Sequence, residues 1–175
     1  MLLARADSGS RLVVGVVAFA LFMDYLIYGL LVPLMPYSPA QATSEAQLGL
    51  LYGGYSAGVL LATPLFGYFG DRIGYRLPMI YGVLLSATAL ALFALAPNLY
   101  LLLLGRLFQG TAAAASWTAG LALIAEHYPE KRVEMMGYAL MGSTAGSLLG
   151  PLIGGSLYEA GGYSLPFAVT GLRRP

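Results

Sequence analysis

The chain has 175 residues, of which 58% are hydrophobic and 10% are charged, and its mean hydropathy is +0.74. A soluble domain carries about 25% charged residues, so this composition excludes a soluble protein and indicates one that resides in the lipid bilayer. The formal net charge of +1 provides no attraction for nucleic acid. The absence of cysteine excludes disulfides, thiol catalysis and thiolate metal sites.

Five apolar segments are long enough to cross a bilayer, which takes about 20 helical residues at about 1.5 Å each. These spans cover residues 12–35, 48–69, 77–96, 99–125 and 133–158. A partial sixth segment lies over 164–172, and its apolar residues 165–172 correspond to only about 12 Å of helix. We therefore predict an all-α membrane protein with five complete transmembrane helices and the start of a sixth.

Lysine and arginine residues outside the spans fall in alternate connections. Before the partial sixth segment they are Arg5 and Arg11, then Arg72 and Arg76, then Lys131 and Arg132. The opposite connections, over 37–47, 97–98 and 159–163, contain none. Because cytoplasmic loops hold the excess of basic residues in membrane proteins, we expect a cytoplasmic N-terminus and a cytoplasmic connection between the second and third spans.

Two charged residues, Asp24 and Arg106, lie deep inside the predicted spans, away from their ends. Asp24 is about 18 Å from the inner boundary and Arg106 about 10 Å from the outer one, and in a core about 30 Å thick these depths nearly coincide. Charges at such depth are costly and mark proton or cation sites. The alternatives are a buried structural ion pair and an Asp24 that its apolar surroundings keep protonated. Whether the two side chains touch is left open.

The connection between the second and third spans is charged and rich in glycine, with the sequence Gly-Tyr-Phe-Gly-Asp-Arg-Ile-Gly-Tyr-Arg. We expect Asp71 to cap the following helical turn, where its charge meets the positive end of the helix dipole. Gly67 and Gly74 permit close approach and unusual backbone angles. Arg72 and Arg76 either pair with carboxylates or form the positive cluster that sets the topology.

Glycines recur every four residues along the fifth span and form what we call the glycine stripe. Its members are Gly142, Gly146, Gly150 and Gly154. On a helix this spacing leaves one side without side chains, so that a neighbouring backbone can approach closely. We expect Pro151 and Gly155 to interrupt the stripe near its outer end, because proline removes a backbone hydrogen bond and bends helices. Ordinary small-residue packing is the alternative interpretation.

Aromatic residues are frequent in the first, second and fourth spans. Tyr28 lies one helical turn beyond Asp24 on the same face. The others are Tyr25, Tyr52, Tyr55, Phe108 and Trp117. We expect an aromatic cavity facing Asp24 that suits flat, hydrophobic or cationic substrates, the alternative being interfacial or lipid-facing placement. His127 is the only histidine and has no second strong ligand nearby, so neither a metal site nor a cofactor is expected.

Four of these features resemble motifs of the major facilitator superfamily. The connection between the second and third spans resembles its signature loop, matched by Gly67, Asp71, Arg72, Gly74 and Arg76, with Tyr75 replacing the first of the usual basic pair. Arg106-Leu107-Phe108-Gln109-Gly110 resembles the motif of an intramembrane arginine followed by Gln-Gly. The glycine stripe, with Pro151 and Gly155, resembles the fifth-helix motif of antiporters. The first span with Asp24 is similar to that of twelve-spanner drug/proton antiporters.

The resemblance implies that residues 1–175 are the incomplete N-terminal half of a transporter that has two six-helix halves around a central path. It implies that Asp71 and Arg72 act in the inner gate with partners in the other half. It places Arg106 and Gln109 in the central cavity, where Arg106 tunes proton coupling and Asp24 is the proton acceptor. We therefore expect an integral protein of the plasma (inner) membrane that exchanges protons for small molecules, as in drug resistance, and a chain that does not transport alone.

Other functions are weighed against this expectation. No enzyme is expected, because the chain has no Walker loop, GxSxG elbow or HExxH motif. A sugar or metabolite proton symporter is one alternative, against which the Gly150-Pro151 motif argues. A non-transporting receptor or assembly subunit could use the glycine stripe for helix association, but it would not need ionisable residues at mid-membrane.

Overall fold

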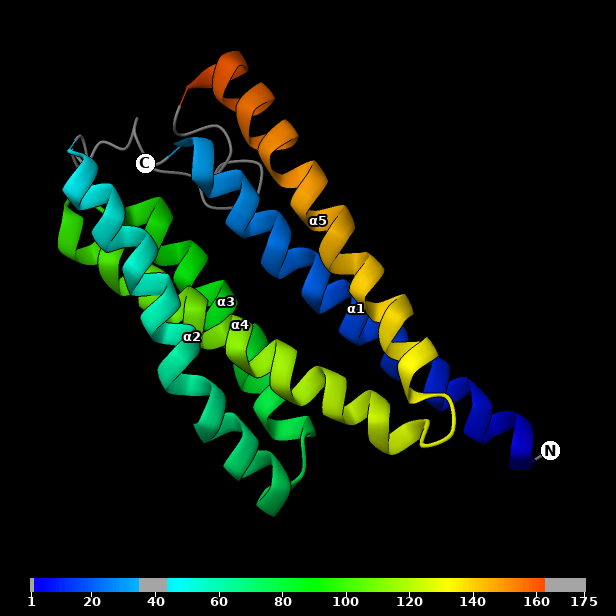
Figure 1. Cartoon of the computed structure of the whole chain (residues 1–175). Coiled ribbons are helices and arrows are strands. Elements are labelled where there is room, and N and C mark those ends of the chain that lie inside the picture. Colours follow the sequence, from blue (N-terminus) through cyan, green and yellow to red (C-terminus); the bar gives the residue numbers. More distant parts are fainter. Residues whose placement is uncertain (1, 35–43, 163–175) are drawn as a thin grey trace.

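The computed structural model describes residues 2–34 and 44–162, which form five helices (Figure 1). They are α1 (Leu2–Leu34), α2 (Glu45–Ile73), α3 (Arg76–Leu95), α4 (Leu99–His127) and α5 (Arg132–Gly161). Every element of the described chain is an α-helix, which confirms the predicted all-α class. The partial sixth span expected over 164–172 lies outside the described residues.

Four of the described helices are long and apolar enough to cross a membrane, namely α1 over Arg11–Leu31 and the whole of α2, α3 and α4. The 30-residue α5 is not among them, and its many glycine, serine and threonine residues lower its apolarity. It nevertheless runs parallel to α1, since Gly142 meets Ala18 and Gly154 meets Leu30. That α5 is a fifth span remains a prediction, which this packing supports.

Local hydrogen bonds explain where two helices begin. Ser44 and Gln47 form a capping box, in which the Gln47 amide donates to Ser44 Oγ at 3.2 Å and the Ser44 amide donates to Gln47 Oε1 at 3.3 Å. This box starts α2 at Glu45, three residues before the predicted span. Asn98 caps α4 by accepting a hydrogen bond from the Leu101 amide at 3.0 Å.

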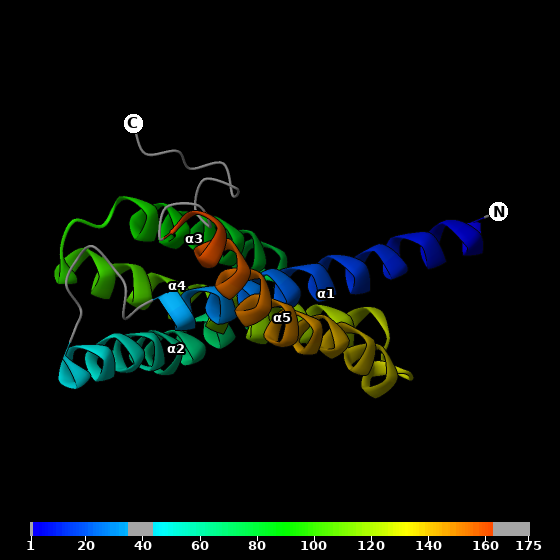
Figure 2. The ribbon, with the colours of Figure 1, turned by 90° about the horizontal axis from the view of Figure 1, so that it is seen from above.

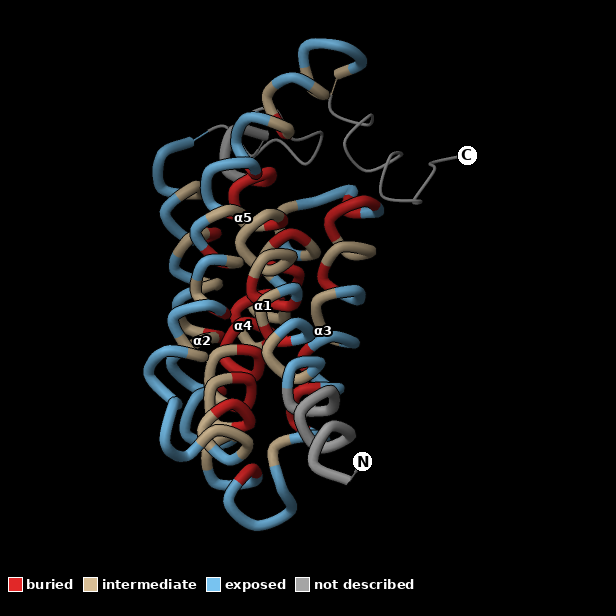
Figure 3. The backbone as a smooth tube through the Cα atoms, turned by 90° about the vertical axis from the view of Figure 1, so that its right-hand side faces the viewer, coloured by how far each residue is buried: buried red, intermediate tan, exposed pale blue. Residues whose placement is uncertain are grey.

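The helices associate as two parallel pairs, α1 with α5 and α2 with α4, and α3 packs on α4 (Figures 1 and 2). α4 has the longest buried face and lies at the centre of the bundle (Figure 3). Large apolar side chains such as Leu60 and Leu148, exposed by 74% and 72%, cover the outside. Such a surface is suited to lipid rather than water.

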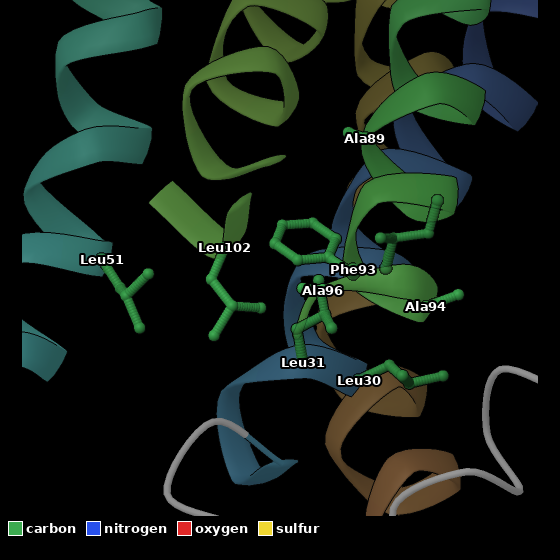
Figure 4. Close-up of a cluster of buried hydrophobic side chains, with 9 residues drawn as sticks. Leu30, Leu31, Leu51, Ala89, Phe93, Ala94, Ala96 and Leu102 are labelled. Carbon is green, nitrogen blue, oxygen red and sulfur yellow. The ribbon is translucent and has the colours of Figure 1, made fainter. Parts of the chain in front are cut away.

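Two buried apolar clusters stabilise the bundle at different heights. The first, drawn in part in Figure 4, contains Ile27, Leu30, Leu31, Leu51, Ala89, Phe93, Ala94, Ala96 and Leu102. The second contains Val17, Ala20, Leu21, Met79, Ala119, Leu123, Ile124 and Ala139. Along α1, Asp24 lies between the residues of the two clusters, and along α4, Arg106 does the same. The polar residues of the candidate site therefore form a layer between two apolar ones.

Candidate functional site

Arg106 of α4 is fully buried and contacts side chains from three other helices. Its guanidinium carbon lies 5.5 Å from the ring centres of Tyr28 in α1 and Tyr52 in α2, and 5.6 Å from that of Phe93 in α3. Its Nη1 donates a hydrogen bond to Gln109 Oε1 at 2.9 Å, one helical turn away. The faces of the rings are negative and stabilise a cation removed from water. The structure thus brings together Tyr28, Arg106 and Gln109, which the sequence singled out.

Asp24 lies in a different environment, a groove of about 420 Å³ between α1 and α3 with one wall from α4. The Ser86 hydroxyl of α3 donates a hydrogen bond to Asp24 Oδ1 at 2.8 Å. Ser116 of α4 is buried and lines the same groove, whose other walls are mainly apolar. Asp24 Oδ2 has no hydrogen-bond partner among the described residues. The sequence left open whether Asp24 and Arg106 touch, and the structure gives the two charges different partners.

A separate aromatic pocket of about 470 Å³ lies between α1, α2 and α4. Tyr25, Tyr55 and Trp117 line it, and the Tyr25 and Trp117 rings meet edge to face with centres 6.1 Å apart. Tyr28 connects this pocket to Arg106, since its ring centre is 4.9 Å from that of Tyr55. The pocket is wide enough for a small organic molecule and offers ring faces to a flat or cationic one.

Asp24 does not itself line the aromatic pocket, although it lies close enough to Tyr25 and Tyr55 to act on them electrostatically. The aromatic pocket is lined by Tyr25 and Trp117, whereas the groove is lined by Asp24 and Ser116, the residues that precede them. Successive residues of a helix point about 100° apart, so neighbours in sequence line different pockets. Phe108 packs against the first apolar cluster instead of lining the aromatic pocket.

Sequence reasoning missed three residues of the site, Phe93, Ser86 and Ser116. Phe93 carries no signal, because a phenylalanine in an apolar span is ordinary. Ser86 and Ser116 had a weak one, since a hydroxyl inside a span needs a hydrogen-bond partner. That Ser86 would find its partner in Asp24 was not predictable, because this depends on which helices flank α1.

The connection between α2 and α3 differs from the expectation at Asp71. α2 continues to Ile73, so Asp71 lies in its last turns, and no side-chain hydrogen bond caps α3. Asp71 instead accepts a hydrogen bond from the Tyr75 hydroxyl, and the Tyr75 ring covers Gly70, where a Cβ would clash. This hydrogen bond to Asp71 raises the pKa of the Tyr75 hydroxyl above its ordinary value of 10.0.

The other residues of this connection are arranged in simpler ways. Gly74 has φ of 84°, the left-handed region that favours glycine, as predicted. Gly67 is not closely approached, since a Cβ there would lie 3.9 Å from Thr118 Cγ2. The exposed Arg72 stacks on Tyr68, 4.6 Å from its ring centre, and Arg76 is the exposed first residue of α3.

We expect Tyr75→Phe to loosen this connection without disturbing the helices. The variant keeps the ring over Gly70 but removes the hydrogen bond to Asp71, which is exposed and therefore contributes little. Trypsin should cleave after Arg72 or Arg76 about twofold faster, since the free energy needed to open the loop falls by part of the net free energy of one hydrogen bond. Tyr81→Phe in α3 is the control. Unchanged cleavage in Tyr75→Phe would show that the hydrogen bond does not restrain the loop.

The glycine stripe packs directly on α1, as its spacing predicted. Added Cβ atoms at the four stripe positions would each clash with a carbonyl oxygen of α1, those of Ala18, Phe22, Leu26 and Leu30. The predicted interruption is wrong, because α5 is helical through Pro151 and Gly154 beyond it still contacts Leu30. Pro151 is accommodated by Gly29 of α1, where a Cβ would lie 2.8 Å from Pro151 Cδ.

Adjacent glycines allow this contact to be tested. A Cβ at Gly154 would lie 2.7 Å from the Leu30 oxygen, whereas a Cβ at Gly155 would have nothing within 4 Å. Gly154→Ala should lower stability by about 1–3 kcal/mol through overpacking, and Gly155→Ala should be neutral or stabilising by up to about 1 kcal/mol through helix propensity. Thermal unfolding in detergent measures both. Equal unfolding temperatures would contradict the packing of the stripe on α1.

Comparison with known proteins yields a family and a set of relatives. The model of the Major Facilitator Superfamily matches residues 17–172. A probable vesicular acetylcholine transporter-B of Danio rerio is 36% identical over 178 residues, covering 95% of this chain and 36% of the relative. The human vesicular acetylcholine transporter is 36% identical over 138 residues, covering 78% and 26%. An uncharacterized MFS-type transporter of Schizosaccharomyces pombe is 29% identical over 173 residues, covering 90% and 37%.

These matches agree with the motifs and with the helical bundle. The chain spans about a third of the length of the curated relatives it matches. The family match covers the residues that surround Asp24, Arg106 and the glycine stripe. The chain is an integral membrane protein that belongs to the Major Facilitator Superfamily.

Proposed function

We propose that this chain is the N-terminal half of a secondary transporter that exchanges protons for small hydrophobic or cationic compounds. The observation that carries the proposal is the pair of ionisable side chains, Asp24 and Arg106, held between the two apolar clusters. Ionisable residues at that depth are costly and are retained at proton and ion pathways. Asp24 is the residue that gains and loses the proton, and Arg106 is the permanent charge of the cavity.

The substrate half of the proposal rests on the aromatic pocket. Tyr25, Tyr55 and Trp117 offer ring faces to a flat or cationic molecule. Relatives that are named for acetylcholine, a small organic cation, favour the cationic class. Their names also say vesicular, which makes a vesicle membrane the alternative to the plasma membrane expected from the sequence.

The separation of the two pockets bears on how proton exchange is coupled to substrate binding. A proton on Asp24 and a substrate in the aromatic pocket do not compete for the same contacts, because the groove and the pocket share no lining residue. Coupling would instead pass through α1 and α4, which contribute to both. Protonation that changes how α1 packs against α3 would then alter the pocket on its other side.

Counterflow in vesicles tests this function. The transporter that contains this chain is reconstituted in proteoliposomes, with ethidium as a hydrophobic cation probe and a pH-sensitive dye inside. An imposed proton gradient should drive ethidium against the movement of protons. Movement of both in the same direction would favour a symporter, and the absence of saturable, proton-dependent flux of any tested solute would favour the non-transporting alternative.

A further inference from the structure

Ser86 differs from most of the helical hydroxyl groups in the described residues in where it donates its hydrogen bond. A serine or threonine inside a helix usually satisfies its hydroxyl on a carbonyl one turn earlier in the same helix. Seven others do so here, namely Ser56, Thr63, Thr88, Thr111, Ser143, Thr144 and Ser156. Ser86 instead donates across to another helix, to Asp24 Oδ1 at 2.8 Å. Its side chain therefore acts on α1 and not on its own backbone.

Ser86 is one of two hydroxyl groups that act on the carboxyl group of Asp24, the other being Ser116 of α4, and its hydrogen bond to Oδ1 has ordinary geometry. The groove around Asp24 is lined largely by apolar residues, with Ser86 and the buried Ser116 as its other polar members. Asp24 Oδ1 accepts the hydrogen bond, while Oδ2 has no hydrogen-bond partner among the described residues. The two oxygens of one carboxyl group are thus in unequal positions.

We propose that Ser86 is a positioning residue that holds Oδ1 of Asp24 toward α3 and leaves Oδ2 as the oxygen that gains and loses the proton. The inference rests on the proposed role of Asp24 in proton exchange. The proton on Oδ2 comes from water on one side of the membrane and leaves to water on the other. Ser86 keeps its own proton and donates the same hydrogen bond to Oδ1 in both states.

Infrared difference spectroscopy between acidic and alkaline pH tests this on the chain in lipid nanodiscs. Asp24→Asn identifies the carbonyl band of protonated Asp24 by removing it. Ser86→Ala should move that band to higher frequency, because a hydrogen bond to Oδ1 weakens the C=O bond. Ser86→Thr, which keeps a hydroxyl, should restore the original frequency. Thr88→Ala is the matched control, since Thr88 lies on the same helix and bonds to its own Leu84 oxygen.

The outcomes separate this inference from the function on which it rests. A band that Ser86→Ala leaves unmoved overturns the positioning role but not proton exchange at Asp24. The absence of any pH-dependent Asp24 band overturns both. A double-mutant cycle of thermal unfolding with Ser86→Ala and Asp24→Ala gives a second measurement. A double variant that loses less stability than the sum of the two single variants supports the contact, and strictly additive losses of stability overturn it.

Discussion

Proton-driven transport should be abolished by Asp24→Asn in the transporter that contains this chain. Asparagine has nearly the same shape and its amide oxygen still accepts the hydrogen bond from Ser86. The variant therefore keeps the packing of the groove between α1 and α3 but has no group that exchanges a proton. Substrate exchange without a proton gradient should persist, because the aromatic pocket does not include Asp24.

Transport of ethidium in proteoliposomes, with and without a proton gradient, measures both activities. Glu45→Gln is the control, since Glu45 is an exposed acid in the first turn of α2, away from the groove. Gradient-driven uptake by Asp24→Asn at the normal rate would exclude Asp24 as the coupling residue. Loss of exchange as well would place Asp24 in substrate binding.

Replacement of Arg106 should have the largest effect on stability. Its side chain is fully buried against Tyr28, Tyr52 and Phe93, and it donates to Gln109. Arg106→Ala leaves a cavity among the rings and removes the donor to a buried amide oxygen, so we expect a loss of about 3–5 kcal/mol. Arg106→Lys keeps the charge but not the planar group that stacks on rings, so we expect an intermediate loss.

Arg72→Lys provides a matched control, because Arg72 also stacks on a tyrosine, Tyr68, but is exposed. Its stability should change by less than about 1 kcal/mol, since exposed cation–π pairs contribute little. Thermal unfolding in detergent compares the variants. Equal losses of stability in Arg106→Lys and Arg72→Lys would mean that burial among three rings does not increase the contribution of the arginine to stability.

Helix positions were predictable because they depend on local properties. The predicted spans match four membrane-length helices within a few residues. The start of α2 differs because the capping box of Ser44 and Gln47 adds a turn before the apolar run. Asp71 was misassigned for a similar reason, as α2 continues past residue 69, where the predicted span ends, and includes Asp71.

The candidate site was predictable only in part. That Arg106 is enclosed by protein agrees with its position inside a predicted span, and its contact with Gln109 is local to one helix turn. Its aromatic partners come from α1, α2 and α3, and nothing in the sequence indicates that these three helices meet at Arg106. That Asp24 lines the groove and not the aromatic pocket was not predictable, because it depends on the rotation of α1 against α3 and α4.

The sequence by itself determined that this is a helical membrane protein with two charged residues deep in its spans and a stripe of glycines along one helix. These properties depend on hydropathy and on helical periodicity, which act over neighbouring residues. Only the tertiary structure decided that the glycine stripe packs on α1, that Asp24 binds Ser86, and that the aromatic pocket lies on another side of α1. Those contacts join residues far apart in the chain, and they are selected by how closely whole helices can pack, which no single segment encodes.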